Sequence, residues 1–198
     1  MKLLVGLGNP GREYVAHRHN VGFRVIEAVA AAARISLDQA RFHGRFGSGL
    51  WQGEPVALML PETFMNRSGT AVSAALEALP LADPDRDLIV VYDDADLPLG
   101  RLRLRARGSD GGQKGVRDIL ERTGRAVPRL RFGIGRPATP QDTRAFVLEA
   151  FSPEEAAPLA GAIDRAVSAL ACWVVEGIEP AMNRFNASAT PAENEGAP

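Results

Sequence analysis

The stretch Lys2-Leu-Leu-Val-Gly-Leu-Gly-Asn-Pro-Gly11 decides the fold class, because an apolar run ends in a glycine-rich polar loop before a helical pattern begins at Val21. Similar runs predict further strands at Val56–Leu60, Leu88–Asp93, Arg101–Arg107 and Arg129–Gly135. Helical patterns lie at Val21–Ala33, Ala71–Leu79, Lys114–Arg122 and Pro153–Glu176. Apolar strands interleaved with helices predict an α/β fold, a single three-layer domain whose mostly parallel mixed sheet has helices on both faces.

The composition fits one globular domain in a reducing compartment. The chain has 198 residues, of which 45% are hydrophobic. We expect the domain to cover residues 1–185 and residues 186–198, which lack large apolar side chains, to form a disordered tail. The single cysteine, Cys172, excludes an internal disulfide and zinc sites built on cysteine pairs. With no signal peptide expected and no run near the roughly 18 apolar residues of a membrane span, we expect a cytoplasmic protein.

A net charge of -1 hides two halves of opposite sign. Residues 101–136 contain 11 Lys and Arg against 3 Asp and Glu, whereas residues 149–198 contain 2 against 8. In the alternating run Arg101–Arg107, the arginines share one face of the predicted strand. Such a basic surface can attract phosphates whatever their base sequence, although a merely solvated strand face is the alternative.

The first loop, Gly6-Leu-Gly8-Asn9-Pro10-Gly11, matches the Gly-x-Gly-x-x-Gly pattern of dinucleotide sites. The surrounding sequence argues against that reading, because a polar stretch delays the helix and the acidic residue Glu27 lies in a helical pattern instead of ending a second strand. The pattern favours a strand end that opens into a loop and leaves the Asn9 amide at the carboxyl edge of the sheet, where open α/β sheets bind ligands.

A histidine and a carboxylate are predicted at the same edge. His19 lies in the loop after the first strand, and Asp93 ends a buried strand. A carboxylate in that position can accept the Nδ1–H of the imidazole, fix its tautomer and leave Nε2 free as a base. There is no Gly-x-Ser-x-Gly nucleophile motif, so in a hydrolase the base would activate water directly. His17 and His43 have no comparable neighbours, and we assign them no role.

Two further loops join strands to helices. Asn66, in Thr63-Phe-Met-Asn66, is either a helix cap or an amide that binds substrate, and Phe64 is either core or a contact for an aromatic base. The glycine-rich loop Gly108–Gly115 is either a flexible lid or a phosphate site at a helix N-terminus. The acids Asp93, Asp94 and Asp96 need not share a face, so no magnesium site is predicted.

Together these segments resemble the bacterial peptidyl-tRNA hydrolase family, collinearly from Lys2 to about Phe185. The matching motifs are Gly-Leu-Gly-Asn-Pro-Gly (6–11), Tyr14 followed by Arg-His-Asn (18–20), Thr-Phe-Met-Asn (63–66), Asp-x-x-Asp-Leu-Pro (93–98) and Arg-Phe-Gly-Ile-Gly-Arg-Pro (131–137). The resemblance implies hydrolysis of the ester between a peptide and the 3′ ribose of tRNA, as well as of N-blocked aminoacyl-tRNA. It implies no metal or other cofactor, no membrane and a monomer.

The resemblance also implies roles for individual residues. His19 would be the general base, Asp93 would orient it, and Asn9 would help to recognise the peptide amide. Asn66 would bind substrate near the scissile carbonyl. The positions implied to contact tRNA are Tyr14 and Phe64 for its end, and Arg105 and Arg131 for its phosphates.

Four positions depart from the family pattern. His17 stands where the family usually has Ser or Thr. Gln113 and Lys114 replace the His-Asn of the glycine-rich loop, and the Lys114 ammonium cannot accept a hydrogen bond, although it can contact a phosphate. A basic residue common after the last motif is Pro140 here. The rival hypothesis is an RNA-splicing or ribosome-associated binding protein with the same fold, which the intact His19, Asp93, Asn9 and Asn66 disfavour.

Overall fold

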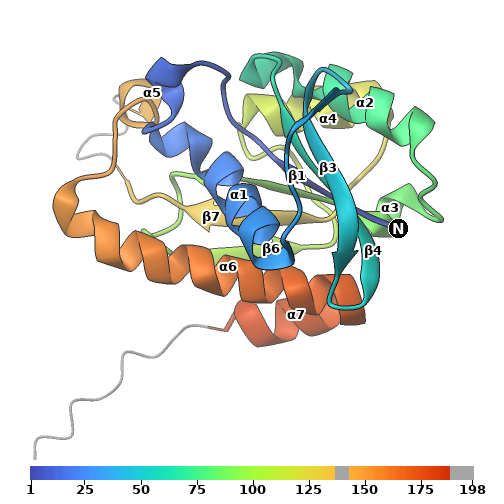
Figure 1. Ribbon diagram of the computed structural model, residues 1–198. Helices are drawn as coiled ribbons and strands as arrows, with labels where there is room; N and C mark the ends of the chain where they lie inside the picture. The colour runs from blue at the N-terminus through green and yellow to red at the C-terminus, as the bar shows by residue number, and fades with distance from the viewer. Residues whose placement is uncertain (137–142, 188–198) are drawn as a thin grey trace, which may run out of the picture.

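One seven-stranded sheet organises the computed structural model, which describes residues 1–136 and 143–187 (Figure 1). The strands are β1 (Lys2–Gly6), β2 (Gln39–Arg41), β3 (Gly44–Trp51), β4 (Glu54–Pro61), β5 (Leu88–Asp94), β6 (Leu102–Arg105) and β7 (Arg129–Gly133), in the order β2-β3-β4-β1-β5-β7-β6. Strands β4, β1, β5 and β7 are parallel, and β3 and β6 run antiparallel to their neighbours. The predicted mixed, mostly parallel sheet is confirmed.

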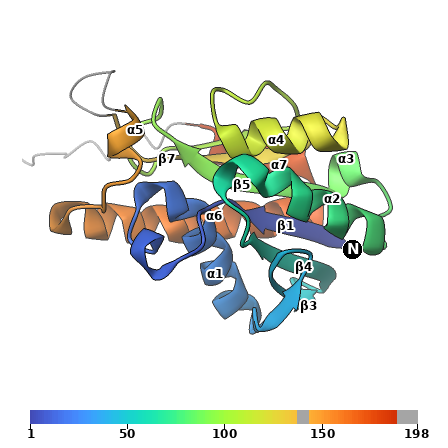
Figure 2. The same ribbon diagram turned by 90° about the horizontal axis from the view of Figure 1, so that it is seen from above.

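Helices cover both faces of the sheet, as predicted (Figures 1 and 2). They are α1 (Val21–Ala33), α2 (Ser68–Ala78), α3 (Pro84–Asp87), α4 (Lys114–Thr123), α5 (Thr143–Phe146), α6 (Ala156–Glu176) and α7 (Ile178–Phe185). One core lies between the sheet and α1, α6 and α7, and the other lies between the sheet, α2 and α4. Because β5 is buried over its whole length between the two cores, its end can carry a charge only where a loop or helix supplies partners.

Two glycines allow the start of α1 to lie against the backbone of the central strands. A Cβ atom on Gly22 would lie 2.4 Å from the Val91 oxygen and 2.5 Å from the Leu7 oxygen. On Gly6, it would lie 2.3 Å from the Gly22 oxygen. This close approach brings the turn just before α1, residues 18–20, over the ends of β1 and β5.

The hairpin of β2 and β3 was not predicted, and neither was α7. Three glycines interrupt the apolar pattern of β3 (Gly44–Trp51), and a Cβ on Gly47 would lie 2.1 Å from the Ser36 oxygen, so close packing accounts for at least one of them. The predicted strand Arg101–Arg107 is shorter, at Leu102–Arg105, but it alternates as expected, with Leu102 and Leu104 buried.

The predicted tail begins with a residue that closes the edge of the sheet. The Asn186 side chain accepts a hydrogen bond from Leu104 N (2.7 Å) and donates one to Leu104 O (3.0 Å), and Arg101 donates to the Asn186 oxygen. Asn186 thus takes the place of a neighbouring strand beside β6. The rest of the tail prediction, from residue 188 onward, lies outside the described residues.

One helical segment, Pro153–Glu176, is long and apolar enough to cross a membrane by length and composition, with a mean hydropathy of 1.4 over its most apolar stretch. No segment of this kind is predicted from the sequence. Core helices pass the same test, and α6 buries Leu159, Leu170 and Trp173 in the core that it shares with α1 and the sheet. We therefore interpret α6 as a core helix.

Candidate active site

The predicted catalytic residues converge at the carboxyl ends of β1 and β5. Asn9 follows β1, Asp93 lies near the end of β5, and His19 belongs to the 3₁₀ turn Arg18–Asn20 that leads into α1. Figure 2 shows the dark blue segment that joins β1 to α1 beyond the end of β1. The convergence follows from parallel topology, since the carboxyl ends of adjacent parallel strands share one edge.

His19 and Asp93 form the predicted pair, with His19 Nδ1 2.8 Å from Asp93 Oδ2. The Asp93 side chain is only 4% exposed and that of His19 17%. Burial of the imidazole by itself lowers the pKa of His19, but the charge of Asp93 and its hydrogen bond outweigh burial, so the pKa of His19 is raised. The nearby charge of Lys114 acts weakly in the opposite direction on this pKa. With Nδ1–H donated to Asp93, Nε2 is the free ring nitrogen.

Gln113 holds the second oxygen of the Asp93 carboxylate. Its Oε1 accepts a hydrogen bond from Val116 N (2.8 Å) and so caps α4. This bond fixes the orientation of the amide, whose Nε2 donates to Asp93 Oδ1 (3.3 Å) and lies 3.1 Å from Met65 Sδ. The residue that replaces the family's histidine therefore supports the carboxylate without adding a titratable group.

Asn9 is fixed by two neighbours. Asn20 bonds to both backbone groups of Asn9, accepting from N and donating to O, each at 2.9 Å. The side-chain Oδ1 of Asn9 accepts a hydrogen bond from Met65 N at 2.9 Å. Because Oδ1 is used in this way, the NH₂ group of Asn9 is the part that can donate to a ligand.

The loop that carries His19 is tied to the segment before α6. His19 N donates to Val147 O, and Arg18 N donates to Glu149 O, each at 2.9 Å. The buried Arg18 guanidinium binds Glu155 through two hydrogen bonds of 2.9 and 2.7 Å. It also stacks between the rings of Phe146 and Phe151, at 4.4 and 4.7 Å from their centroids. A two-bond ion pair of this kind restrains the backbone on which His19 is carried.

The remaining predicted substrate contacts surround this centre. Asn66, in the turn Met65–Arg67, is exposed, and Phe64 is 57% exposed. The exposed Lys114 is the first residue of α4, near enough to His19 to affect its pKa. Tyr14 packs edge-on against His17, with ring centroids 5.3 Å apart. The helix-capping role considered for Asn66 does not apply, because Arg67 occupies the cap position of α2.

The predicted basic face is present on β6 and β7. The strand register pairs Arg103 with Arg131 and Arg105 with Arg129, so four arginines share one face of the two strands. They differ in their surroundings. Arg129 is buried and binds the carbonyl oxygens of Gly108 and Ser109, and Arg131 forms an ion pair with Asp94. Arg103 and Arg105 form no salt bridge within residues 1–136 and 143–187 and so are free to attract an anion.

The acidic residues that follow Asp93 have partners of their own. Asp94 pairs with Arg131 and also accepts a hydrogen bond from Asp96 N, and Asp96 lies 3.4 Å from Arg136. Among the described residues no group of three or more His, Cys, Asp or Glu side chains is placed to hold a metal ion.

Four supporting residues were missed from the sequence: Asn20, Gln113, Arg18 and Glu155. Asn20 and Arg18 were visible only as neighbours of His19, and Gln113 only as a departure from a family pattern. The signal for Gln113 was its place immediately before a helix, where a side chain caps the backbone. No local signal links Glu155 to Arg18, which is 137 residues away.

Comparisons with known proteins identify the family. Residues 3–194 match the family model described as peptidyl-tRNA hydrolase. The chain is 49% identical to a peptidyl-tRNA hydrolase of Synechococcus sp. (strain JA-3-3Ab), over 94% of this chain and 83% of that protein. It is 46% identical to the peptidyl-tRNA hydrolase of Symbiobacterium thermophilum, over 93% of this chain and 98% of that protein. The crystal structure of peptidyl-tRNA hydrolase from Acinetobacter baumannii superposes with a TM-score of 0.86 at 40% identity, covering 94% of this chain and 95% of that one.

Proposed function

The chain belongs to the peptidyl-tRNA hydrolase family and hydrolyses the ester of peptidyl-tRNA, and from that premise we propose that His19 is its general base and Asp93 the residue that orients it. The single observation that carries this proposal is the 2.8 Å contact between His19 Nδ1 and Asp93 Oδ2. The contact leaves Nε2 free to take a proton from water, and an ester is reactive enough for a positioned water molecule to attack it.

The proposed reaction needs one proton relay. His19 Nε2 removes a proton from water as the water oxygen attacks the ester carbonyl. The tetrahedral intermediate then breaks the bond to the 3′ oxygen of the ribose, and the imidazolium returns the proton to that oxygen. The products are tRNA with a free 3′ hydroxyl and the peptide carboxylic acid, which loses its proton to solvent and becomes the carboxylate. Asp93 stabilises the transient imidazolium because its buried carboxylate accepts the hydrogen bond from Nδ1.

Asn9 and Asn66 are the proposed substrate amides. The Asn9 NH₂ group is free to donate because Met65 N already occupies its Oδ1, so Asn9 is suited to a carbonyl oxygen of the peptide. Asn66 is exposed one residue beyond Met65 and can bind near the scissile carbonyl. A single donor aimed at the developing oxyanion contributes roughly 3–4 kcal/mol.

We propose that the tRNA contacts the basic face of β6 and β7 and the residues around it. Arg105 is free to bind a phosphate, whereas Arg131 already forms an ion pair with Asp94. Lys114 adds a further cation beside the catalytic centre. Tyr14 and Phe64 supply aromatic rings for the unpaired 3′ end. These contacts read the tRNA backbone and end, not its base sequence.

We further propose a metal-free, cytoplasmic monomer. The proposed mechanism uses only an imidazole, a carboxylate and amides, so it requires no Lewis acid. The lone Cys172 fits a reducing compartment, and the substrate arises in translation. The RNA-binding alternative is not favoured, since the similar proteins are peptidyl-tRNA hydrolases.

Single-turnover hydrolysis of N-acetyl-aminoacyl-tRNA tests the assignment. His19→Ala should lower the rate by about 10²–10⁴-fold, the usual contribution of a general base. An unchanged affinity for tRNA would show that binding survives. If the variant kept more than about a tenth of the wild-type rate, His19 would not be the base.

A further inference from the structure

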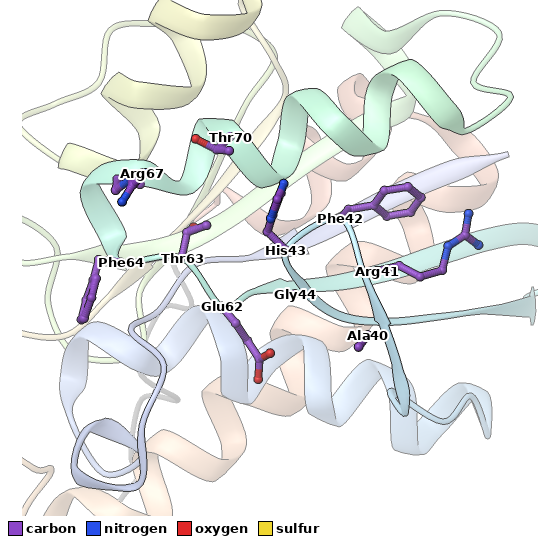
Figure 3. A pocket seen from close by; sticks show the side chains of 10 residues that line it. All are labelled: Ala40, Arg41, Phe42, His43, Gly44, Glu62, Thr63, Phe64, Arg67 and Thr70. Carbon is purple, nitrogen blue, oxygen red and sulfur yellow. The ribbon is translucent and has the colours of Figure 1, made fainter.

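A cavity of about 580 Å³ lies beside the catalytic centre and has no part in the mechanism described so far. It is bounded by the tip of the β2–β3 hairpin, the segment after β4 and the start of α2 (Figure 3). Its lining residues include Arg41, His43, Thr63, Phe64, Arg67 and Thr70. Its volume falls within the range of about 300–1,000 Å³ that is usual for ligand sites.

The cavity opens on the same edge of the sheet as the catalytic residues. Residues 62–64 directly follow the carboxyl end of β4, and Gly44, which begins β3, pairs with Pro61 at that end. Phe64 lines the cavity, and the next residue, Met65, bonds to Asn9 through its amide and contacts Gln113 through its sulfur. The cavity therefore begins one residue away from the catalytic cluster.

The strand order places the basic face and the cavity on opposite sides of the scissile bond. Along the sheet, β7 and β6 carry Arg131 and Arg105 on one side of β5 and β1, and β4 and β3 carry the cavity on the other. The substrate ester joins a peptide to a tRNA and must lie over β5 and β1, where His19 is. If the body of the tRNA occupies the basic side and its 3′ end reaches no farther than Phe64, the peptide leaves the centre toward the cavity.

The cavity lining is more apolar than polar, but it includes two arginines that have no carboxylate partner among the described residues. Neither Arg41 nor Arg67 forms a salt bridge within the part of the chain that the structure describes, and the buried Thr63 hydroxyl has no hydrogen-bond partner there. Figure 3 shows His43 pointing toward the start of α2, while Glu62, the cavity's acidic residue, points away from Arg67. The Arg41 guanidinium lies over the rings of Phe42 and Phe46, at 4.5 and 5.0 Å from their centroids, but has no carboxylate partner. Its charge, the charge of Arg67 and the Thr63 hydroxyl suit carboxylates and carbonyl oxygens.

The hairpin tip is held in an unusual backbone conformation. Phe42 and His43 both have positive φ, 53° and 56°, in a two-residue turn where Asn-Gly is the favoured sequence. The ring of Phe42 packs edge-on against Phe46, at 5.2 Å between centroids. This packing fixes the turn that presents His43 to the cavity. Left-handed residues other than glycine are often found at ligand sites.

We propose that this cavity binds the peptidyl part of the substrate from the second residue outward, and that Arg67 and Arg41 favour acidic side chains there. The inference rests on the proposed function, because it takes the ester to lie at His19. The first residue remains at Asn9 and Asn66, and the chain passes Phe64 into the cavity. Recognition of this kind acts only on substrates long enough to reach beyond the first residue.

The test compares three substrates on the same tRNA: N-acetyl-aminoacyl-tRNA, an N-acetyl-tetrapeptidyl-tRNA with glutamates at the second and third residues from the ester, and its lysine counterpart. Arg67→Ala should lower kcat/KM for the glutamate peptide about fivefold, the effect of one exposed ion pair. It should leave the one-residue substrate unchanged. Arg67→Glu should reverse the preference between the glutamate and lysine peptides.

The controls separate this inference from the proposed function. Arg86→Ala removes an exposed arginine from α3, which precedes β5 at the opposite edge of the sheet, and should change none of the three rates. Arg41→Ala provides a second cavity variant with the same expected direction as Arg67→Ala. Equal losses on all three substrates would assign the cavity to tRNA, and no loss would leave it unused; either result overturns the inference. Failure of the wild-type protein to hydrolyse any of them would instead overturn the proposed function.

Discussion

Asp93 Oδ2 lies 2.8 Å from His19 Nδ1, although 74 residues separate the two in the chain. The second carboxylate oxygen is bound by Gln113 Nε2, so both oxygens have partners in a nearly dry position. The charge of Asp93 and its hydrogen bond to the imidazole both raise the pKa of His19. The pH behaviour of the protein follows from this pair.

Replacing Asp93 by Asn should shift the activity profile to lower pH. Asp93 raises the pKa of His19, so removing its charge lowers that pKa, and the acid limb of kcat/KM against pH moves down. The maximal rate should also fall, by up to roughly 10⁴-fold, because an asparagine can donate to Nδ1 and stabilise the tautomer that lacks a free Nε2. Stopped-time hydrolysis across pH 5–9 measures both effects. If the acid limb did not move, Asp93 would not be the cause of the raised pKa of His19.

The same pair should stabilise the fold at low pH. Because the pKa of His19 is raised in the folded protein, its protonated form contributes stability that is complete below the unfolded value of about 6.5. That contribution is lost as pH rises through the folded pKa. The difference in unfolding free energy between wild type and His19→Gln, measured in urea, should shrink from pH 6 to pH 8. If this difference grew from pH 6 to pH 8, the pKa of His19 would not be raised in the folded protein.

Arginines of the basic face should differ in their effect on tRNA binding. Arg105→Ala should raise KM and reduce the slope of log affinity against log salt by about 1, the loss expected for one phosphate contact. Arg131→Ala should reduce the slope by less, since its guanidinium already pairs with Asp94, and it should lower Tm because Asp94 is then left unpaired. Titration of tRNA at several salt concentrations measures the slopes. Unchanged slopes in both variants would remove this face from the tRNA site.

Lys114→Asn tests the main departure from the family pattern. Lys114 lowers the pKa of His19, so its removal should move the acid limb of the activity profile to slightly higher pH. If Lys114 contacts a phosphate, KM should rise and the salt slope should fall. A kcat within about twofold of wild type would show that an acceptor at this position is not required, as 0.4 kcal/mol or so is too small for a reacting group. Lys114→Met provides the control that removes charge without adding an acceptor.

Gly22→Ala should destabilise the fold and displace His19 together. The added methyl would lie 2.4 Å from the Val91 oxygen, so α1 must move away from the sheet, at a cost of about 1–3 kcal/mol or more. Gly161→Ala is the matched control within α6, where the nearest atom to a new Cβ is 3.8 Å away and the change should stabilise by about 0.5–1 kcal/mol. Thermal unfolding of both variants tests the pair. Equal Tm values would show that α1 tolerates the displacement.

The sequence by itself determined the layered architecture and the catalytic edge. Long apolar runs such as Leu88–Asp93 and the helix Val21–Ala33 carry their periodicity locally, and parallel topology then brings their polar ends together. Local signals were weak for β3, whose glycines serve close packing against Ser36. The hairpin and the cavity beside it were therefore not predicted.

Only the tertiary structure decided which partners hold the catalytic residues and which arginines remain free. Gln113 reaches Asp93, Glu155 reaches Arg18, and Asp94 engages Arg131, while Arg105 keeps its charge available. These contacts join residues from 20 to 137 positions apart. Local periodicity reports which face of an element is buried, but the partner of a buried charge depends on how separate elements pack, and that information is not local.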